Sequence, residues 1–208
     1  MVVALINKGQ GFFDPVSLSQ APHPMIGSTS MELADIDSDG DVDVLFTNGD
    51  AHDLQMDPKP YHGVQWLENT GQLKFTYHSI GRFYGAATAV PGDLDGDGDI
   101  DIVAGSWLNY WEDDKRQSLI WFENDGKQNF SRHNITNKPN RIVSLALKDI
   151  NGDESLDVIA GIFRIDLLLG RLDRPADGNA KSTSSDSDSG KSRVLLLENI
   201  VLKKGATF

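Results

Sequence analysis

The sequence predicts an all-β fold built from repeated units of four short antiparallel strands, an arrangement typical of β-propeller blades. Three observations lead to this prediction. An aspartate-rich stretch occurs three times at nearly constant spacing. Each stretch leads into a short apolar run of the kind that forms a buried strand. An Asn-x-Gly turn between two alternating runs, which is a hairpin signal, follows the first two stretches.

The aspartate-rich stretch is most complete in the middle of the chain. Aspartate occupies every second position from Asp93 to Asp101, and the intervening residues include Gly98 at position 6. Carboxylates this close repel one another unless a cation lies among them. Oxygen ligands at alternating positions suit Ca²⁺, which accepts about six to eight of them in an adaptable geometry. Glycine at position 6 allows the backbone to turn with a positive φ.

The stretch is a repeat. The pattern D-x-D-x-D-G-x-x-D begins at Asp35 and Asp93, and an imperfect copy begins at Asp149, so the starts are spaced by 58 and 56 residues. Repeats of this length indicate an array or a propeller. An acidic, solvated turn is the alternative for one such stretch. Three at a regular period, each ahead of an apolar strand, favour metal binding.

The EF-hand is the obvious rival for an aspartate-rich loop. It requires a bidentate glutamate at position 12 and a helix on each side. Position 12 in the three stretches is Phe46, Ala104 or Ala160, each within an apolar, strand-like run. The EF-hand is therefore excluded, and so is a dockerin-like loop, which also needs an acid there.

The composition of the chain excludes further classes of protein. The 208 residues allow one large or two small domains. The net charge is −12 and the sequence has no basic stripe that could neutralise phosphates, which argues against nucleic-acid binding. The chain has no cysteine, so it has no disulfide framework and no thiolate chemistry. No apolar run approaches the roughly 20 residues of a membrane span. Residues 1–7 are too short for a signal peptide.

A second motif accompanies the loops. Trp66 and Trp121 each open the pattern W-φ-E-N-x-G-x-x-x-F, and the strand that follows ends near His78 or His133. We expect the tryptophans to pack between repeats and the histidines to be structural, because both recur with the repeat. Residues 7–13 form the same hairpin without its tryptophan, and residues 196–199 open a fourth copy.

The repeat can now be assembled from four strands. The first strand is expected at 30–34, 88–92 and 144–148, and the second at 42–48, 100–105 and 156–161. The third carries the tryptophan and the fourth ends at the histidine. This divides the chain into a half blade (1–20) and three blades (21–80, 81–137 and 138–208), with a disordered Ser/Asp/Gly-rich insertion near 172–192.

With these loops and hairpins, the chain resembles the FG-GAP/VCBS repeat family, the calcium-binding blades also found in integrin α-subunits. The resemblance implies two Ca²⁺ sites and a third, weaker one, since Glu154 replaces the glycine and Asn151 removes a charge. The implied metal residues are Asp35, Asp37, Asp39, Asp41 and Asp43; Asp93, Asp95, Asp97, Asp99 and Asp101; and Asp149, Asn151, Asp153 and Asp157. Asp41 and Asp99 would contribute their backbone carbonyls.

About three and a half blades are fewer than the four to eight that usually close a propeller. Such a partial propeller has exposed edges, which proteins avoid. We therefore expect either a piece of a longer, seven-bladed propeller or two copies that complete one ring as a homodimer.

The loops on the face opposite the aspartate-rich stretches are candidates for ligand recognition. They span 48–63, 106–117 and 162–192 and carry aromatic and charged side chains, which suit a protein or glycan partner. The relevant residues are His52, Tyr61, His62, Trp107, Tyr110, Trp111, Glu112, Asp113, Asp114, Lys115 and Arg116. Trp107 and Trp111 could instead pack against neighbouring repeats.

The leading hypothesis is a non-catalytic, calcium-stabilised module for binding or adhesion in an extracellular, cell-surface or periplasmic location. A second is an accessory or catalytic domain of a secreted carbohydrate-active enzyme, and a third is a lectin. Glu112, Asp113 and Asp114 are the only dense acids on the loop face, and no nucleophile–base–orienter set or zinc spacing is evident.

Overall fold

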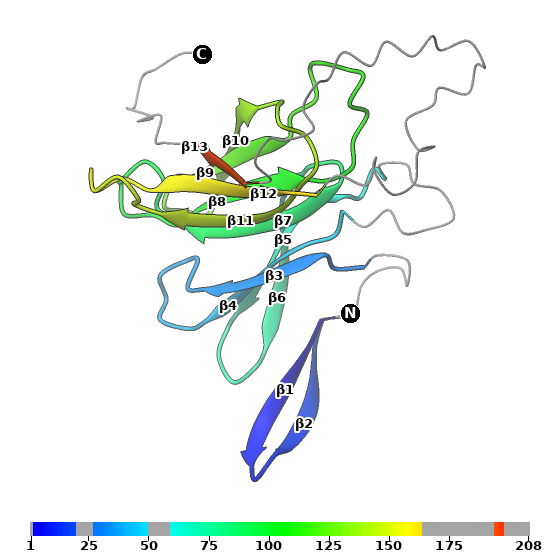
Figure 1. Ribbon diagram of the computed structural model, residues 1–208. Helices are drawn as coiled ribbons and strands as arrows, with labels where there is room; N and C mark the ends of the chain where they lie inside the picture. Colours follow the sequence, from blue (N-terminus) through cyan, green and yellow to red (C-terminus); the bar gives the residue numbers. More distant parts are fainter. Residues whose placement is uncertain (1, 20–26, 50–58, 164–193, 198–208) are drawn as a thin grey trace, which may run out of the picture.

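The computed structural model describes residues 2–19, 27–49, 59–163 and 194–197. Within these ranges the chain contains no helix and consists of antiparallel strands in four sheets (Figure 1). The predicted all-β class is confirmed. Among the described residues no helix has the length and hydropathy to cross a membrane.

The strands follow one another within each sheet in the order of the sequence. The first sheet is a hairpin, the second and third have four strands, and the fourth has three described strands. In order, the sheets contain β1 (Val2–Gly9) and β2 (Phe12–Ser19); β3 (Ser30–Ala34), β4 (Asp43–Thr47), β5 (Gly63–Asn69) and β6 (Phe75–Arg82); β7 (Ala86–Gly92), β8 (Asp101–Ser106), β9 (Leu119–Asn124) and β10 (Phe130–Thr136); and β11 (Ile142–Lys148), β12 (Asp157–Ile162) and β13 (Val194–Leu197).

The three larger sheets share one register at the aspartate-rich loops. The last residue of the first strand pairs with the last aspartate of the loop in each sheet: Ala34 with Asp43, Gly92 with Asp101, and Lys148 with Asp157. The first and second strands therefore lie within two residues of the predicted positions. The fourth strand of the last repeat and the insertion near 172–192 lie outside the described residues.

Successive sheets pack face to face and enclose an apolar core at each interface. Strands β3, β7 and β11, the first strands of their sheets, are neighbours in space (Figure 1). Strands β4 and β8 have both faces covered and are buried along their whole length. The buried residues of these cores are Val2, Val44, Phe46 and Leu67 between the first and second sheets; Ile36, Leu45, Val64, Trp66, Phe83, Ala86, Ala89, Ile102, Ala104, Ile120 and Phe122 between the second and third; and Val90, Leu94, Val103, Leu119, Trp121, Ile142, Val158 and Ala160 between the third and fourth.

The two tryptophans of the hairpin motif lie in these cores, as expected. Trp66 is 3% exposed and Trp121 is 4% exposed. Each indole stacks on the histidine paired with it across the hairpin, with ring centroids 4.6 Å apart for His78 and 4.8 Å for His133. Each histidine also contacts a glutamate of its own hairpin. The two histidines therefore have a structural role.

Candidate metal centre

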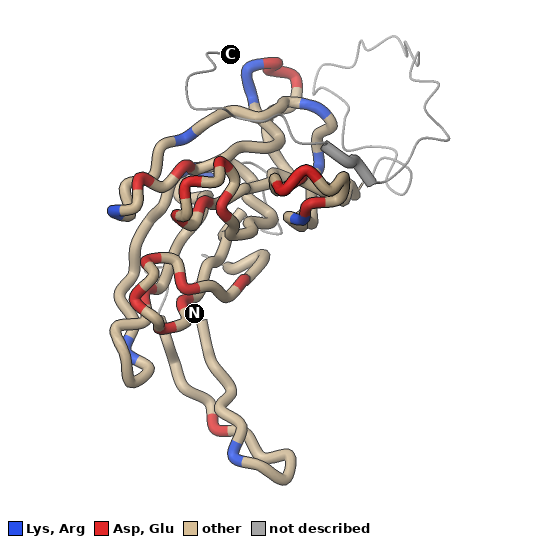
Figure 2. The backbone as a smooth tube through the Cα atoms, turned by 90° about the vertical axis from the view of Figure 1, so that its left-hand side faces the viewer, with Lys and Arg blue, Asp and Glu red and all other residues tan. Residues whose placement is uncertain are grey.

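The three aspartate-rich loops lie on the same side of the molecule. Each joins the first and second strands of its sheet, and because the sheets stack in parallel orientation the loops project together at the left of Figure 1. Figure 2, which views that side, shows acidic residues gathered on all three loops. The first two loops each lie next to the turn between the third and fourth strands of their own sheet.

All three loops have the same backbone winding. Positions 4 and 6 have positive φ in each of them, a conformation that glycine adopts without strain. The sequence indicated this requirement at position 6 only, although Gly96 and Gly152 already occupy position 4. The φ values are 61° and 94° for Ser38 and Gly40, 77° and 97° for Gly96 and Gly98, and 82° and 69° for Gly152 and Glu154.

The aspartate at position 1 organises this winding. The Asp93 carboxylate accepts hydrogen bonds from the backbone N–H groups of Gly96, Asp97 and Gly98 at 2.8–3.1 Å. Asp35 accepts from positions 5 and 6 of its loop, and Asp149 from positions 4 and 6. Each loop is therefore held in shape by hydrogen bonds from its own backbone to the position 1 carboxylate.

Carboxylates gather at one point in the first two loops. Asp35, Asp37 and Asp39 each offer an oxygen within 4.8 Å of the others, and Asp93, Asp95 and Asp101 do the same. Taken together, the two clusters use positions 1, 3, 5 and 9 of the pattern. Both clusters could hold a metal ion.

The third loop is chemically different at the same place. The Asn151 side-chain amide donates to Asp153 Oδ2 at 3.1 Å, so an internal hydrogen bond stands where the other loops have two carboxylates. Glu154 occupies the left-handed region at position 6. Asn151 therefore removes a carboxylate from the cluster, and Glu154 strains the backbone of this loop.

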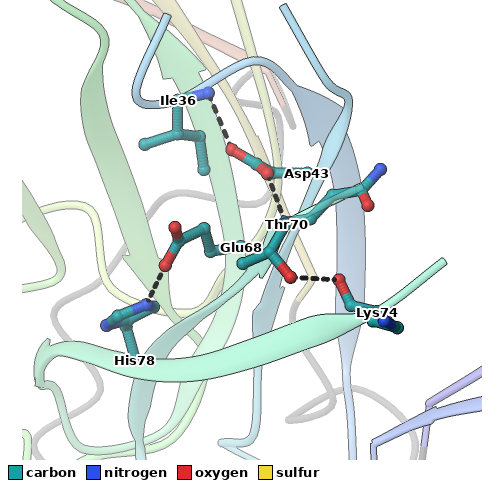
Figure 3. A network of polar contacts seen from close by, with 7 residues as sticks. Ile36, Asp43, Glu68, Thr70, Lys74 and His78 are labelled. Atoms are coloured by element: carbon teal, nitrogen blue, oxygen red, sulfur yellow. Dashed lines mark hydrogen bonds and ion pairs between the residues drawn. The ribbon is translucent and has the colours of Figure 1, made fainter. Parts of the chain in front are cut away.

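The aspartate at position 9 is fully buried in all three loops: Asp43, Asp101 and Asp157 are each 0% exposed. Asp43 Oδ2 accepts from the N–H of Ile36 at 3.0 Å (Figure 3). Its Oδ1 accepts from the N–H of Asn69 at 2.8 Å. Asp101 makes the equivalent bonds to Leu94 and Asn124. This carboxylate therefore connects its loop to the neighbouring hairpin.

The asparagine of the hairpin motif completes this connection. Asn124 Nδ2 donates to the carbonyl of Ile100, at position 8 of the loop, while Oδ1 accepts from the N–H groups of Gly126 and Gln128. Asn69 makes the matching bonds to Val42 and Gly71. The aspartate-rich loop and the Asn-x-Gly hairpin thus form one hydrogen-bonded unit, which explains why the two motifs occur together.

The electrostatics of the second loop suit a cation. Burial raises the pKa of Asp101 to about 6, against the lowering effect of its hydrogen bonds from Asn124 and Leu94. Burial followed by the charge of Asp97 raises the pKa of Asp95. Within the described ranges no lysine or arginine forms an ion pair with Asp93, Asp95 or Asp101. A buried carboxylate among other carboxylates is stabilised by a bound cation.

The first loop follows the same trend. Burial raises the pKa of Asp43, partly offset by the hydrogen bonds from Asn69 and Ile36. Burial also raises the pKa of Asp37, and the neighbouring Asp43 and Asp39 charges add to the effect. The residues of both loops therefore fit a divalent cation held by oxygen atoms.

The aspartates at position 7 lie apart from the clusters. The Asp99 carboxylate lies against Gly126, where an added Cβ would be 2.5 Å from its Oδ2. Asp41 lies in the same way near Gly71, with a corresponding distance of 3.6 Å. The Asp99 side chain therefore lies against the neighbouring hairpin turn, and the Asp41 side chain lies beside the corresponding turn.

On the opposite side of the sheets, the loop 106–117 is held by its own side chains. The Arg116 guanidinium lies over the rings of Tyr84 and Tyr110, 5.5 and 5.8 Å from their centroids, and its Nε is 3.2 Å from Asp113. Trp107 Nε1 donates to the carbonyl of Phe163 on the next sheet at 3.4 Å. Trp107 and Trp111 are partly buried.

Two histidines were expected on this side, and the structure describes one of them. His62 is fully buried, and its Nδ1 accepts hydrogen bonds from the N–H groups of Lys59 and Gly85. It therefore fixes the local backbone. His52 lies outside the described residues.

Comparison with known families agrees with the motifs. Residues 58–104 match the family model of the FG-GAP-like repeat. The matched segment runs from the Trp66 hairpin through the complete aspartate-rich loop that begins at Asp93. No curated protein matches the chain.

Proposed function

We propose that this chain is a calcium-binding β-propeller module of FG-GAP-like repeats with a non-catalytic role in binding or adhesion. The four stacked sheets are its blades, with their first strands nearest the propeller axis. The observation that carries the proposal is the second loop, where the fully buried Asp101 lies with Asp93 and Asp95 around one point.

The donor set favours Ca²⁺ over other common ions. The loops offer carboxylate and carbonyl oxygens and contain no histidine or cysteine, which Zn²⁺ prefers. Mg²⁺ demands near-ideal octahedral geometry, whereas Ca²⁺ tolerates irregular oxygen cages. Asp35, Asp37, Asp39 and Asp43 would hold one ion, and Asp93, Asp95, Asp97 and Asp101 a second, with the carbonyls of Asp41 and Asp99 as further ligands.

Calcium in these sites would neutralise the carboxylates and stabilise the unit formed by each loop and its hairpin. The chain's own residues supply the preformed winding, since the position 1 aspartates already accept backbone N–H groups. The third loop, with Asp149, Asn151, Asp153 and Asp157, would bind more weakly because it has one carboxylate fewer and a strained position 6.

Recognition would take place on the side opposite the calcium loops. Tyr110 is 45% exposed beside Arg116 and the acids Glu112 and Asp114, a combination that suits a protein or glycan partner. Such a role fits an extracellular, cell-surface or periplasmic location, where calcium is available at the concentrations that extracellular modules require.

Thermal unfolding of the calcium-free chain with added CaCl₂ or MgCl₂ tests the metal part of the proposal. A ligand that binds only the folded state raises its stability by about 2.7 kcal/mol at a concentration of 100 Kd. We expect CaCl₂ to raise Tm and MgCl₂ to have a much smaller effect. An unchanged Tm with CaCl₂ would contradict the proposal.

A glycan array combined with glycosidase and lyase assays tests the functional part. We expect binding without turnover. A hydrolytic or lyase activity that is lost on substitution of Glu112 or Asp114 would instead favour the enzyme hypothesis.

A further inference from the structure

Each of the two hairpin tryptophans has a buried N–H group that makes no hydrogen bond. Among the described residues, the Nε1 atoms of Trp66 and Trp121 have no acceptor, although both indoles are almost fully buried. A buried donor without an acceptor destabilises the folded state, and such groups are rare in proteins. Its occurrence at the same position in two successive sheets therefore requires a physical reason.

The strand register brings each indole next to the aspartate that ends the loop of its sheet. Trp121 pairs with Val103, and Asp101 precedes Val103 by two residues on β8. Because side chains alternate along a strand, Asp101 and Trp121 lie on the same face of the sheet. They are diagonal neighbours, a separation that an aromatic side chain can span. Trp66 and Asp43 have the same relation in the preceding sheet.

The electrostatics of the two aspartates agree with this placement. Burial is the largest influence on the pKa of Asp101 and raises it, whereas the side chain of Trp121 lowers it less strongly than the backbone N–H groups do. Burial and Trp66 act on the pKa of Asp43 in the same two directions. Each indole N–H group is therefore close to its aspartate but outside the geometry of a hydrogen bond.

A histidine stacked on each indole fixes the orientation of the ring. The centroids of Trp121 and His133 are 4.8 Å apart, and His133 Nε2 is 2.8 Å from an Oε2 of Glu123. Trp66 has the same stack with His78, whose contact with its own glutamate is visible in Figure 3. The indole N–H groups are therefore held beside the aspartates.

Tryptophan accompanies the complete loops and not the imperfect one. In the fourth sheet, Leu196 pairs with Ile159 and so takes the register position of the tryptophans. The loop of that sheet has Asn151 and Glu154 where the complete loops have aspartate and glycine. Within the three larger sheets, the indole thus occurs only beside the loops whose carboxylates could hold a cation.

We propose that Trp66 and Trp121 are positioning residues of the two calcium sites, and that cation binding completes a hydrogen bond from the indole N–H to the position 9 carboxylate. The proposal rests on calcium binding by these loops and adds how one ligand is held. An ionised carboxylate has about four lone-pair sites. On Asp101, the N–H groups of Leu94 and Asn124 occupy one on each oxygen, which leaves a site for the cation and a site for the indole.

The effect of such a donor on metal affinity can be estimated from other metal sites. Groups that orient a metal ligand by a hydrogen bond typically raise the affinity about 10- to 100-fold. Loss of the Trp121 N–H group should therefore weaken the second site by at least about tenfold. The first site should not respond, because it has its own indole.

Proton–nitrogen correlation NMR of the full chain observes the indole N–H groups directly. The chain has four tryptophans, and single Trp→Phe variants assign their signals. Addition of CaCl₂ should move the Trp66 and Trp121 signals downfield and slow their exchange with solvent. Trp107 and Trp111 belong to the loop on the opposite side of the sheets, so their signals are internal controls and should stay in place.

An isosteric replacement separates the N–H group from the packing of the ring. Trp121 is replaced by benzothienylalanine, in which a sulfur atom stands in place of the N–H group. Calorimetric titration with CaCl₂ should show the second site weakened by at least about tenfold and the first site changed by less than about twofold. The same replacement of Trp107, whose N–H donates to the carbonyl of Phe163, is the matched control and should leave both calcium sites unchanged.

Urea unfolding distinguishes positioning of the ligand from a purely structural role. In a chelator, the Trp121 replacement should not lower the free energy of unfolding, because the N–H group that it removes has no acceptor there. In CaCl₂ it should lower it. Equal losses of stability in chelator and in CaCl₂ would show a structural role and overturn the proposal.

The remaining outcomes separate this proposal from the one on which it rests. Calcium binding without movement of the Trp66 and Trp121 signals, or with unchanged affinity after the Trp121 replacement, would overturn the positioning role and leave calcium binding by the loops intact. Absence of calcium binding by the unsubstituted chain would overturn both proposals.

Discussion

The Asp43 carboxylate and the backbone N–H group of Asn69 are 2.8 Å apart, although 26 residues separate them in the chain. This contact ties an aspartate-rich loop to the hairpin two strands further on. Asp101 and Asn124 repeat it in the next sheet at the same distance. In these two sheets, the carboxylate that we propose as a metal ligand also holds the hairpin, so metal binding should stabilise the sheet.

Asn124→Ala should lower the free energy of unfolding by about 2–4 kcal/mol, because it leaves the Ile100 carbonyl and the N–H groups of Gly126 and Gln128 without their partner. Urea unfolding in excess CaCl₂ measures the loss. Asn134→Ala, at an exposed position on β10, is the control and should stay within about 0.5 kcal/mol. Equal small effects would show that the link does not stabilise the sheet.

Glu154→Gly should raise the free energy of unfolding by about 1 kcal/mol in the presence of a chelator. Glu154 has a φ of 69°, a conformation that costs a side chain with a Cβ about 1–2 kcal/mol. Ser155→Gly is the control in the adjacent position, where φ is not positive, and should lower stability instead. A decrease for Glu154→Gly as large as that for Ser155→Gly would contradict the common winding of the three loops.

Asp101→Asn should weaken calcium binding by at least about tenfold, and the loss should persist at high salt, because a direct ligand is removed. Asp99→Asn removes the same charge from a side chain that lies against Gly126. Its effect should therefore be smaller and should fade as salt screens it. Calorimetric titration at low and high ionic strength compares the two variants. An equal effect of Asp99→Asn at high salt would mean that the position 7 side chain binds the metal.

The sequence was sufficient for the parts of the structure that depend on local pattern. The aspartate spacing and the apolar runs after Asp43, Asp101 and Asp157 predicted the first two strands of the three larger sheets to within two residues. The tryptophans were correctly predicted to pack between sheets, because their recurrence at Trp66 and Trp121 matches the period of the core.

Other features depend on contacts that no pattern reveals. The hydrogen bond from Asn69 to Asp43 joins two motifs that had been interpreted separately. Position 4 of the loop needs a positive φ, which Ser38 obscured in the first copy. The sequence left open whether Trp107 contributes to ligand recognition or packs against a neighbouring repeat, and its hydrogen bond to the Phe163 carbonyl on the next sheet agrees with the second alternative.

Protons and calcium should compete for Asp101. Its pKa of about 6 in the metal-free protein exceeds the ordinary value of 3.8, so the folded state binds more protons between these values. The free energy of unfolding of the metal-free chain should therefore increase, through this group, as pH falls from 7 to 5. In CaCl₂ the trend should reverse, because protonation releases the metal and affinity falls up to roughly tenfold per pH unit below 6. Thermal melts at pH 7 and pH 5, with and without CaCl₂, check this. In the Asp101→Asn variant, the opposite pH trends with and without CaCl₂ should disappear.

Calorimetric titration of the metal-free chain with CaCl₂ tests the central claim most directly. We predict two strong sites and one weaker site. Asp37→Ala and Asp95→Ala should each remove a strong site, and Asn151→Ala should affect only the weaker one. The double variant Asp37→Ala/Asp95→Ala should retain only the weaker site. Absence of calcium binding by the folded chain, or binding that the double variant leaves unchanged, would contradict the claim that the aspartate-rich loops are calcium sites.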